Sequence, residues 1–227
     1  MRALIFGAKG SIGKYISEKF TQDNINVIGT TTNLYNISDN IILVQKDNTI
    51  HLTTIEPVDI VIWANGDNCN DNINVYDETT FTRIINANVI FILNTLQCLI
   101  KHKKINENAK MVIVSSIFED ITRDNKLSYS ISKSALSGLV KNVAYDLSKQ
   151  NILINNVLPG VLDNEMTHRT LVDQQIEYIK QNNMQFGRLI NMSDVYNIVR
   201  FLVIENTGIT GQSIKVDLGF TNVKKYI

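Results

Sequence analysis

Short apolar runs alternate along the whole chain with longer segments in which apolar residues recur at helical spacing. The short runs are rich in β-branched residues and end at polar or glycine positions, which is typical of strands buried on both faces of a parallel sheet. They predict seven strands, at Ala3–Phe6, Ile25–Thr31, Ile41–Gln45, Asp59–Ala64, Met111–Ser115, Ile152–Leu158 and Ser213–Val216. Helices are predicted over Ile12–Thr21, Glu78–Lys101, Tyr129–Leu147, Leu171–Gln181 and Ser193–Ile204.

This alternation predicts an α/β fold, a doubly wound parallel sheet with helices on both faces. No repeat or Pro/Gly-rich linker interrupts the pattern, so residues 1–227 are expected to form a single domain. The segment between Asp47 and Val58 is too short for a further crossover helix, and a loop or a single turn is expected there. Ligands of such sheets bind beyond the carboxyl ends of the strands, and candidate site residues should therefore follow strands.

Composition narrows the class of partner. The chain has 22 basic and 22 acidic residues, so its formal net charge of zero disfavours binding to nucleic acid or to an anionic membrane. The apolar stretch Asn88–Ile100 is broken by polar residues and too short to span a bilayer, and a cytoplasmic location is expected. Cys69 and Cys98 lack metal-ligand spacing, and two reduced thiols are favoured over a disulfide. No metal site is predicted.

A glycine-rich segment, Gly7-Ala8-Lys9-Gly10-Ser11-Ile12-Gly13, joins the first predicted strand to the first helix. Glycines there allow a tight turn and a close approach to a pyrophosphate, and the free N–H groups at the start of the helix favour its charge. A simple glycine turn is the alternative, but the strand–turn–helix context favours a dinucleotide site.

Tyr129 and Lys133 lie four residues apart near the start of a predicted helix and therefore on the same face. An ammonium group beside a phenol favours the phenolate and should lower the pKa of Tyr129. The pair is thus a candidate acid/base catalyst, although a tyrosine and a lysine at this spacing also occur by chance on many helices.

Together, and in this order, the two motifs resemble the short-chain dehydrogenase/reductase family. Ser116 lies thirteen residues before Tyr129, where the family places its catalytic serine, and Asn88 matches its helix asparagine. Further matches extend the resemblance from residue 2 to about residue 220. It implies the catalytic residues Asn88, Ser116, Tyr129 and Lys133. It also implies a cofactor site formed by Gly7, Lys9, Gly10, Ser11, Ile12, Gly13, Thr30, Thr31, Asn65, Gly66, Tyr129, Lys133, Pro159, Gly160, Leu162 and Asn164.

The chain also departs from the family pattern. Ser11 stands where the commonest motif has glycine, and the glycine has moved to Gly10, as in longer relatives that act on nucleotide sugars. Asn164 replaces a threonine, and its side chain can still hydrogen-bond a carboxamide.

The resemblance implies hydride transfer between a nicotinamide cofactor and the carbonyl or alcohol carbon of a small substrate. In that reaction Tyr129 transfers the hydroxyl proton, Ser116 holds the same oxygen, and Lys133 binds the nicotinamide ribose. Two alternatives stay open: a noncatalytic nucleotide-binding sensor on the same fold, and a nucleotide-sugar epimerase or dehydratase.

Cofactor preference, assembly and substrate access give three further predictions. The second strand ends in Thr30 and Thr31 with no carboxylate, and Lys9 lies in the glycine loop, so NADP is favoured over NAD. The helix Glu78–Lys101 carries more apolar residues than the side facing the sheet needs, among them Ile90, Phe91 and Leu93. Together with the resemblance, this predicts a homodimer or homotetramer. Residues 164–186 are expected to cover the substrate, with Met166, Leu171, Tyr178, Met184 and Phe186 as lining.

Overall fold

The computed structural model of the chain describes residues 1–32, 40–45, 49–164, 167–168, 171–182 and 184–222. Its centre is a seven-stranded parallel sheet in the order β3-β2-β1-β4-β5-β6-β7. The strands are β1 (Arg2–Phe6), β2 (Asn26–Thr31), β3 (Ile41–Leu43), β4 (Val58–Trp63), β5 (Ile105–Val114), β6 (Leu153–Pro159) and β7 (Ser213–Val216). The predicted fold class and strand number are confirmed.

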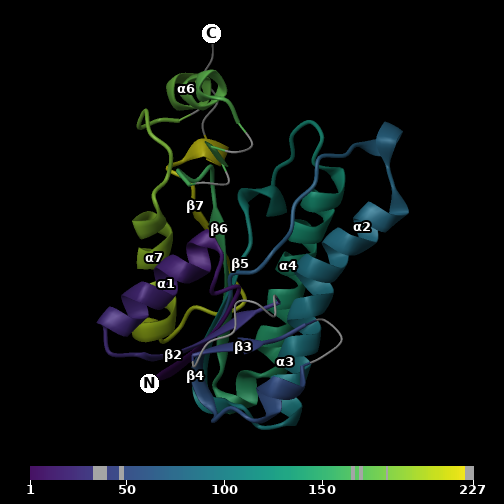
Figure 1. Cartoon of the computed structure of the whole chain (residues 1–227). Coiled ribbons are helices and arrows are strands. Elements are labelled where there is room, and N and C mark those ends of the chain that lie inside the picture. Colours follow the sequence, from purple (N-terminus) through teal and green to yellow (C-terminus); the bar gives the residue numbers. More distant parts are fainter. Residues whose placement is uncertain (33–39, 46–48, 165–166, 169–170, 183, 223–227) are drawn as a thin grey trace.

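Helices cover both faces of this sheet (Figure 1). One layer contains α1 (Ser11–Gln22) and α7 (Met192–Arg200), and the other contains α2 (Glu78–Ile85), α3 (Phe91–Lys101) and α4 (Leu127–Asp146). Strand order reverses between β1 and β4, because the chain crosses to opposite sides of β1. The carboxyl ends of these two strands therefore flank the place where a doubly wound sheet binds its ligand.

Two hydrophobic cores lie on the two faces of the sheet, and alternate residues of each strand contribute to them. Leu4 and Phe6 belong to the core under α3 and α4, whereas Ala3 and Ile5 belong to the core under α1 and α7. The ring of Phe6 stacks on Trp63 at a centroid distance of 5.5 Å. This full burial on both faces explains why the strands appear in the sequence as continuous apolar runs.

The long helix predicted over Glu78–Lys101 is interrupted by a π-helical segment, Asn86–Ile90. Such segments often mark functional sites, and this one carries Asn88. By length and hydropathy the helix could cross a membrane, but its core residues, among them Ile92 and Leu99, pack against the sheet as in an ordinary core helix. Phe91, predicted to be exposed for subunit contact, is instead 6 % exposed and packs edge-on against Phe6.

The connection from β3 to β4 is as short as predicted: its described part holds one 3-10 turn, Ile50–Thr53. Other boundaries differ by a few residues. β5 begins at Ile105 rather than Met111, and an irregularity in its pairing with β4 separates Val58 from Ile60. The strand is longer than predicted because its first residues pair with β4, and local propensity does not report such tertiary pairing.

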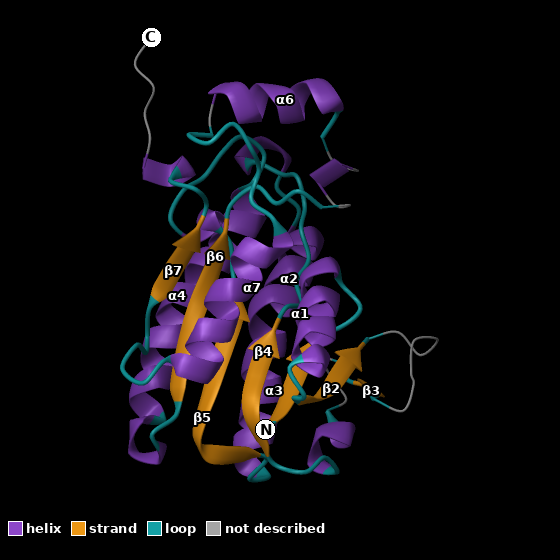
Figure 2. Cartoon of the chain, turned by 90° about the vertical axis from the view of Figure 1, so that its left-hand side faces the viewer, coloured by secondary structure: helices purple, strands orange, loops and turns teal. Residues whose placement is uncertain are grey.

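The segment after β6 forms α6 (Asp173–Asn182), which lies beyond the carboxyl ends of the strands and apart from both helix layers (Figure 2). Ile176, Met184 and Leu189 form a small separate cluster beneath it. That residues 164–186 cover the substrate stays a prediction; the described part of this segment lies at the end of the sheet where the site is expected.

Candidate active site

Two glycines of the glycine loop stand where a side chain would not fit. Gly7 has a φ of 75°, and a Cβ atom on it would lie 2.8 Å from the backbone nitrogen of Asn65. A Cβ on Gly13 would lie 2.3 Å from the carbonyl oxygen of Gly7. Gly10 caps α1 and accepts a hydrogen bond from the Lys14 N–H, while Ser11 begins the helix with an exposed side chain. The loop thus brings the start of α1 against the end of β4, as a pyrophosphate site requires.

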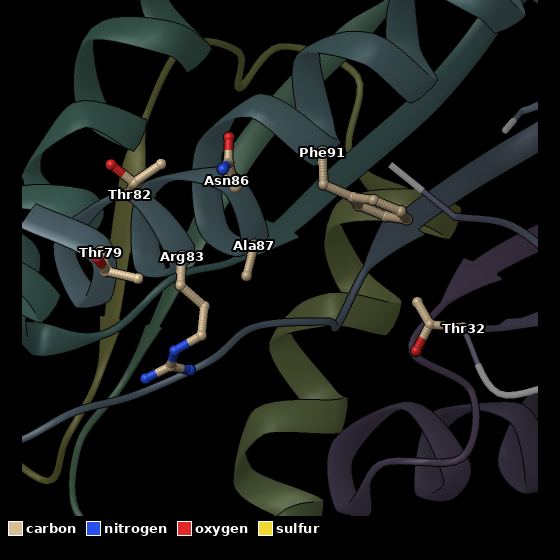
Figure 3. Close-up of a pocket in the computed structure, with 7 residues that line it drawn as sticks. All are labelled: Thr32, Thr79, Thr82, Arg83, Asn86, Ala87 and Phe91. Carbon is tan, nitrogen blue, oxygen red and sulfur yellow. The ribbon is translucent and has the colours of Figure 1, made fainter. Parts of the chain in front are cut away.

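A pocket of about 480 Å³ lies between Thr32, which follows β2, and the residues of α2, the π-helical segment and the start of α3 (Figure 3). Its lining residues are Thr32, Thr79, Thr82, Arg83, Asn86, Ala87 and Phe91. Thr30 and Thr31, the predicted cofactor residues, are buried, and it is the next residue, Thr32, that faces the pocket. Lys9 is exposed, and it is not among the lining residues.

Arg83 was not predicted as a site residue, because no motif marks it. It forms an ion pair with Asp67, the residue that follows Gly66 at the end of β4. Asn65 donates from its side chain to the carbonyl of Ala87 at 3.1 Å. Its Oδ1 atom is buried and has no hydrogen-bond partner among the described residues, so it is free to accept from a ligand.

Asn88 joins the loop after β4 to α4. Its side chain accepts from the Asp67 N–H at 2.7 Å and donates both to the Asp67 carbonyl and to the Ser132 hydroxyl, at 2.9 Å each. A Cβ on Gly66 would lie 3.2 Å from Asn88 Oδ1 and 3.6 Å from Lys133 Nζ. The structure therefore brings Gly66, Asn88 and Lys133 together, as predicted from three distant parts of the sequence.

Ser116 and Tyr129 also meet at this end of the sheet. Ser116 follows β5, caps a short 3-10 turn by accepting from the Phe118 N–H at 3.3 Å, and is 8 % exposed, and its hydroxyl is close enough to Tyr129 to lower the pKa of that phenol. The ring of Tyr129 packs edge-on against Phe118 at 5.8 Å. Burial raises the pKa of Tyr129 above its usual value, and the Ser116 hydroxyl partly opposes this. The predicted net lowering of this pKa is thus wrong, because burial of the phenol is the largest influence on it.

Lys133 is 4 % exposed, and its Nζ atom lies 5.6 Å from the centre of the Tyr129 ring. It donates to the Val114 carbonyl at 3.4 Å. Burial lowers the pKa of Lys133 to about 8, while the carboxylate of Glu119 acts in the opposite direction. Glu119 is itself buried and accepts hydrogen bonds from Ser213 and Asn156. No sequence motif marks this buried acid.

The remaining predicted residues lie at the end of β6. Pro159 ends the strand, and the Gly160 N–H donates to the Val216 carbonyl. The two segments lie so close together that a Cβ on Gly160 would be 2.9 Å from the Cβ of Asp217. Leu162 is buried and pairs with Ile190, and Asn164 accepts from the Thr167 N–H.

The predicted lining of the cover divides into three groups. Met184 is buried and Leu171 packs beside it, whereas Tyr178 and Phe186 are 64 % and 66 % exposed. Met166 lies outside the described residues. Two of the five side chains thus stabilise the cover itself, and two are available for contact with another molecule.

Known proteins are similar to this chain in sequence and in fold. The family model described as enoyl-(acyl carrier protein) reductase matches residues 50–221. A 3-oxoacyl-[acyl-carrier-protein] reductase from Buchnera aphidicola is 27 % identical over 236 residues, with 96 % of both chains covered.

Solved structures give the same result for the fold. A short chain dehydrogenase family protein from Francisella tularensis has a TM-score of 0.87 at 20 % identity, covering 97 % of this chain and 98 % of its own. A gluconate 5-dehydrogenase from Burkholderia cenocepacia, in complex with NADP and tartrate, has a TM-score of 0.86 at 17 % identity, covering 98 % and 96 %. Because the family model matches well over half of the chain and the fold agrees, the chain belongs to the short-chain dehydrogenase/reductase family of oxidoreductases.

Proposed function

We propose that this protein is an NADP-dependent carbonyl reductase that uses Tyr129 as its proton donor. The observation that carries the proposal is the convergence of Asn88, Ser116, Tyr129 and Lys133 at the carboxyl ends of β4 and β5. These side chains come from three parts of the chain, the π-helical segment, the end of β5 and α4, and a noncatalytic nucleotide-binding protein would have no need of all four.

The residues present fit a dinucleotide. Gly7 and Gly13 stand where a side chain would not fit, Asn65 offers a buried acceptor, and a pocket of about 480 Å³ extends from Thr32 to Arg83. The glycine loop would hold the pyrophosphate and Lys133 the nicotinamide ribose. When bound, the nicotinamide supplies the hydride.

The chain's own residues would supply the proton and fix the geometry. The Tyr129 phenol donates its proton to the carbonyl oxygen, and the Ser116 hydroxyl hydrogen-bonds the same oxygen. Lys133, cationic below a pKa of about 8, stabilises the phenolate left on Tyr129. Asn88 fixes the loop after β4 against α4 and keeps Gly66 close to Lys133.

For the substrate, a 3-oxoacyl thioester is the first class to test, because the Buchnera relative is a 3-oxoacyl-[acyl-carrier-protein] reductase over the same length of chain. The purified protein is incubated with NADPH and a panel of 3-oxoacyl thioesters, simple ketones and sugars, and loss of nicotinamide absorbance is compared with alcohol formed. Equal loss of NADPH and gain of 3-hydroxyacyl product is expected. Conversion of a nucleotide sugar without net oxidation, or binding of NADPH without turnover of any compound, would contradict the proposal.

The NADP preference is supported by the absence of a carboxylate in β2, all of which is described, and by the exposed Lys9. Titration of both cofactors should give the lower dissociation constant for NADP, and Lys9→Ala should weaken NADP more than NAD. Equal weakening of both would remove Lys9 from the 2′-phosphate site.

We also propose that two copies associate through α3 and α4. Leu93, Ile131 and Tyr145 are exposed on these helices, and Tyr145 is 82 % exposed. Light scattering at micromolar concentration should show a dimer or tetramer, and a Leu93→Asp variant should shift it toward monomer.

A further inference from the structure

Lys126 is a buried lysine that none of the sequence motifs includes. Its side chain is 5 % exposed, and Nζ donates to Asn68 Oδ1 at 2.9 Å, to the Cys69 carbonyl at 3.1 Å and to Asn70 Oδ1 at 2.7 Å. All three N–H groups of the ammonium are thus used, and all three acceptors belong to the loop after β4. Burying a cation against neutral acceptors costs free energy, so such a residue is retained more readily for function than for stability.

The same ammonium lies beside the proposed proton donor. Lys126 Nζ is 5.6 Å from the centre of the Tyr129 ring, the same distance as Lys133 Nζ. Both distances are within the range of a cation–π contact. Tyr129 is therefore flanked by one lysine from the family motif and by a second that precedes α4.

The loop that binds Lys126 is fixed at both of its ends. At one end, Asn88 holds both backbone groups of Asp67. At the other, the Asp71 carboxylate accepts from the backbone and hydroxyl of Ser128, and the Asp71 carbonyl accepts from Leu127 N–H. Lys126 lies between these anchors, so its ammonium has little freedom to move away from Tyr129.

Several charged or titratable groups face this pair. Burial and Arg123 lower the pKa of Lys126, whereas Cys69 and Asp71 raise it. The Tyr129 ring has Phe118, Lys126 and Lys133 around it and Ser116 near its hydroxyl, and the Glu119 carboxylate acts on Lys133. Among these, Lys126 and Lys133 are the cations close to the phenol ring, and Lys126 alone is tethered by the loop after β4.

We propose that Lys126 is a positioning residue for the reaction: it holds the Tyr129 ring in place and, through its fixed charge, favours the phenolate form of that residue. The inference rests on the proposed function, in which Tyr129 transfers the proton. A cation within about 4–6 Å of an acid typically lowers the pKa of that acid by about one to three units. Lys126 Nζ lies 5.6 Å from the centre of the Tyr129 ring, so a shift at the lower end of that range is expected, which is large enough to measure. A simple structural tether would hold the loop but leave the proton affinity of Tyr129 unchanged.

The test compares variants that change the charge with variants that keep it. Lys126→Gln keeps a hydrogen-bond donor toward Asn68 and Asn70 but removes the cation. Asn70→Asp keeps Lys126 and places a carboxylate against its ammonium. Both should move the Tyr129 titration upward by about one pH unit. Lys126→Arg should restore most of the wild-type value, and Lys141→Gln, which removes an exposed lysine from α4, should change nothing.

Two measurements read the result. The first is NMR titration of isotope-labelled tyrosine, with the Tyr129 signal assigned by its loss in Tyr129→Phe. The second is the pH profile of alcohol oxidation with NADP, in which the rate rises as Tyr129 loses its proton. If the pKa of Tyr129 rises by about one unit, the rate at a fixed pH below that pKa should fall about tenfold. The rate should recover at higher pH.

An unchanged Tyr129 titration in both Lys126→Gln and Asn70→Asp would overturn the inference, as would a loss of rate that is equal at every pH. If Lys126→Gln does not fold, Asn70→Asp, which leaves the lysine in place, decides the result alone. If no substrate is turned over, the proposed function fails, but the NMR titration still tests Lys126 independently.

Discussion

Two regions at the carboxyl end of the sheet differ sharply in how they are held. The catalytic region, formed by the loops after β4 and β5 and the start of α4, is dense with buried polar contacts that involve Asn88, Asp71 and Lys126. In the proposed cover after β6, the described residues form one small hydrophobic cluster around Met184, and Tyr178 and Phe186 are exposed. In the proposed function the first region carries the chemistry and the second contacts the substrate. The contacts of this chain therefore support a reaction type, and the substrate has to be found by experiment.

The largest effect is expected in the catalytic region, for Lys133→Met. Loss of the cation beside Tyr129 removes stabilisation of the phenolate, and turnover should fall about 100-fold or more. Steady-state rates with NADPH measure this, and Lys141→Met, on the exposed side of α4, should keep wild-type turnover. A Lys133→Met enzyme with normal turnover would mean that the catalytic region does not carry the reaction.

The same lysine gives a pH dependence of stability. Its pKa is about 8 in the folded chain against a usual value of 10.5, so between these two pH values the unfolded chain binds more protons. Through Lys133 alone, the free energy of unfolding should therefore rise from about pH 8 to about pH 10.5, by at most about 3 kcal/mol. Denaturant unfolding of wild type and Lys133→Met across this range isolates the contribution. A difference between the two proteins that does not change with pH would show that burial of the ammonium is not costly.

The glycine loop can be tested with a matched pair of glycines. In Gly13→Ala the new methyl group would overlap the Gly7 carbonyl, so we expect a loss of about 1–3 kcal/mol in unfolding free energy and weaker NADPH binding. In Gly138→Ala, on α4, the new methyl meets nothing within 4 Å. That change should stabilise the helix by about 0.5–1 kcal/mol and leave cofactor binding intact. Equal effects of the two substitutions would contradict the close approach at the glycine loop.

The smallest effect on stability is expected in the cover. Tyr178→Ala and Phe186→Ala remove exposed side chains, and each should change the unfolding free energy by less than about 0.5 kcal/mol. Each should raise KM for the substrate severalfold with little change in kcat. Met184→Ala, in the small cluster beneath α6, should by contrast cost about 2 kcal/mol. If the two exposed substitutions leave KM unchanged, these side chains do not contact substrate.

The sequence predicted most of the fold because each strand is buried on both faces and so appears as a local apolar run. The π-helical turn at Asn86–Ile90 could not be predicted, because the contacts of Asn88 with Asp67 and Ser132 are tertiary. The family resemblance predicted that Asn88, Ser116, Tyr129 and Lys133 lie together, and the structure places all four at one end of the sheet, while their catalytic roles stay a proposal. Lys126 was missed, since its acceptors lie more than fifty residues away along the chain. The direction of the Tyr129 pKa was wrong because spacing does not report burial.

The central claim is that this site transfers a hydride to a carbonyl carbon while Tyr129 supplies the proton. It is tested most directly with NADPH carrying deuterium at the transferred position, followed by mass spectrometry of the alcohol product. Wild type should place one deuterium on the carbinol carbon. Tyr129→Phe should bind NADPH with nearly unchanged affinity. It should form the labelled product at a rate lower by about 100-fold or more. Labelled product formed at the wild-type rate by Tyr129→Phe would contradict the account.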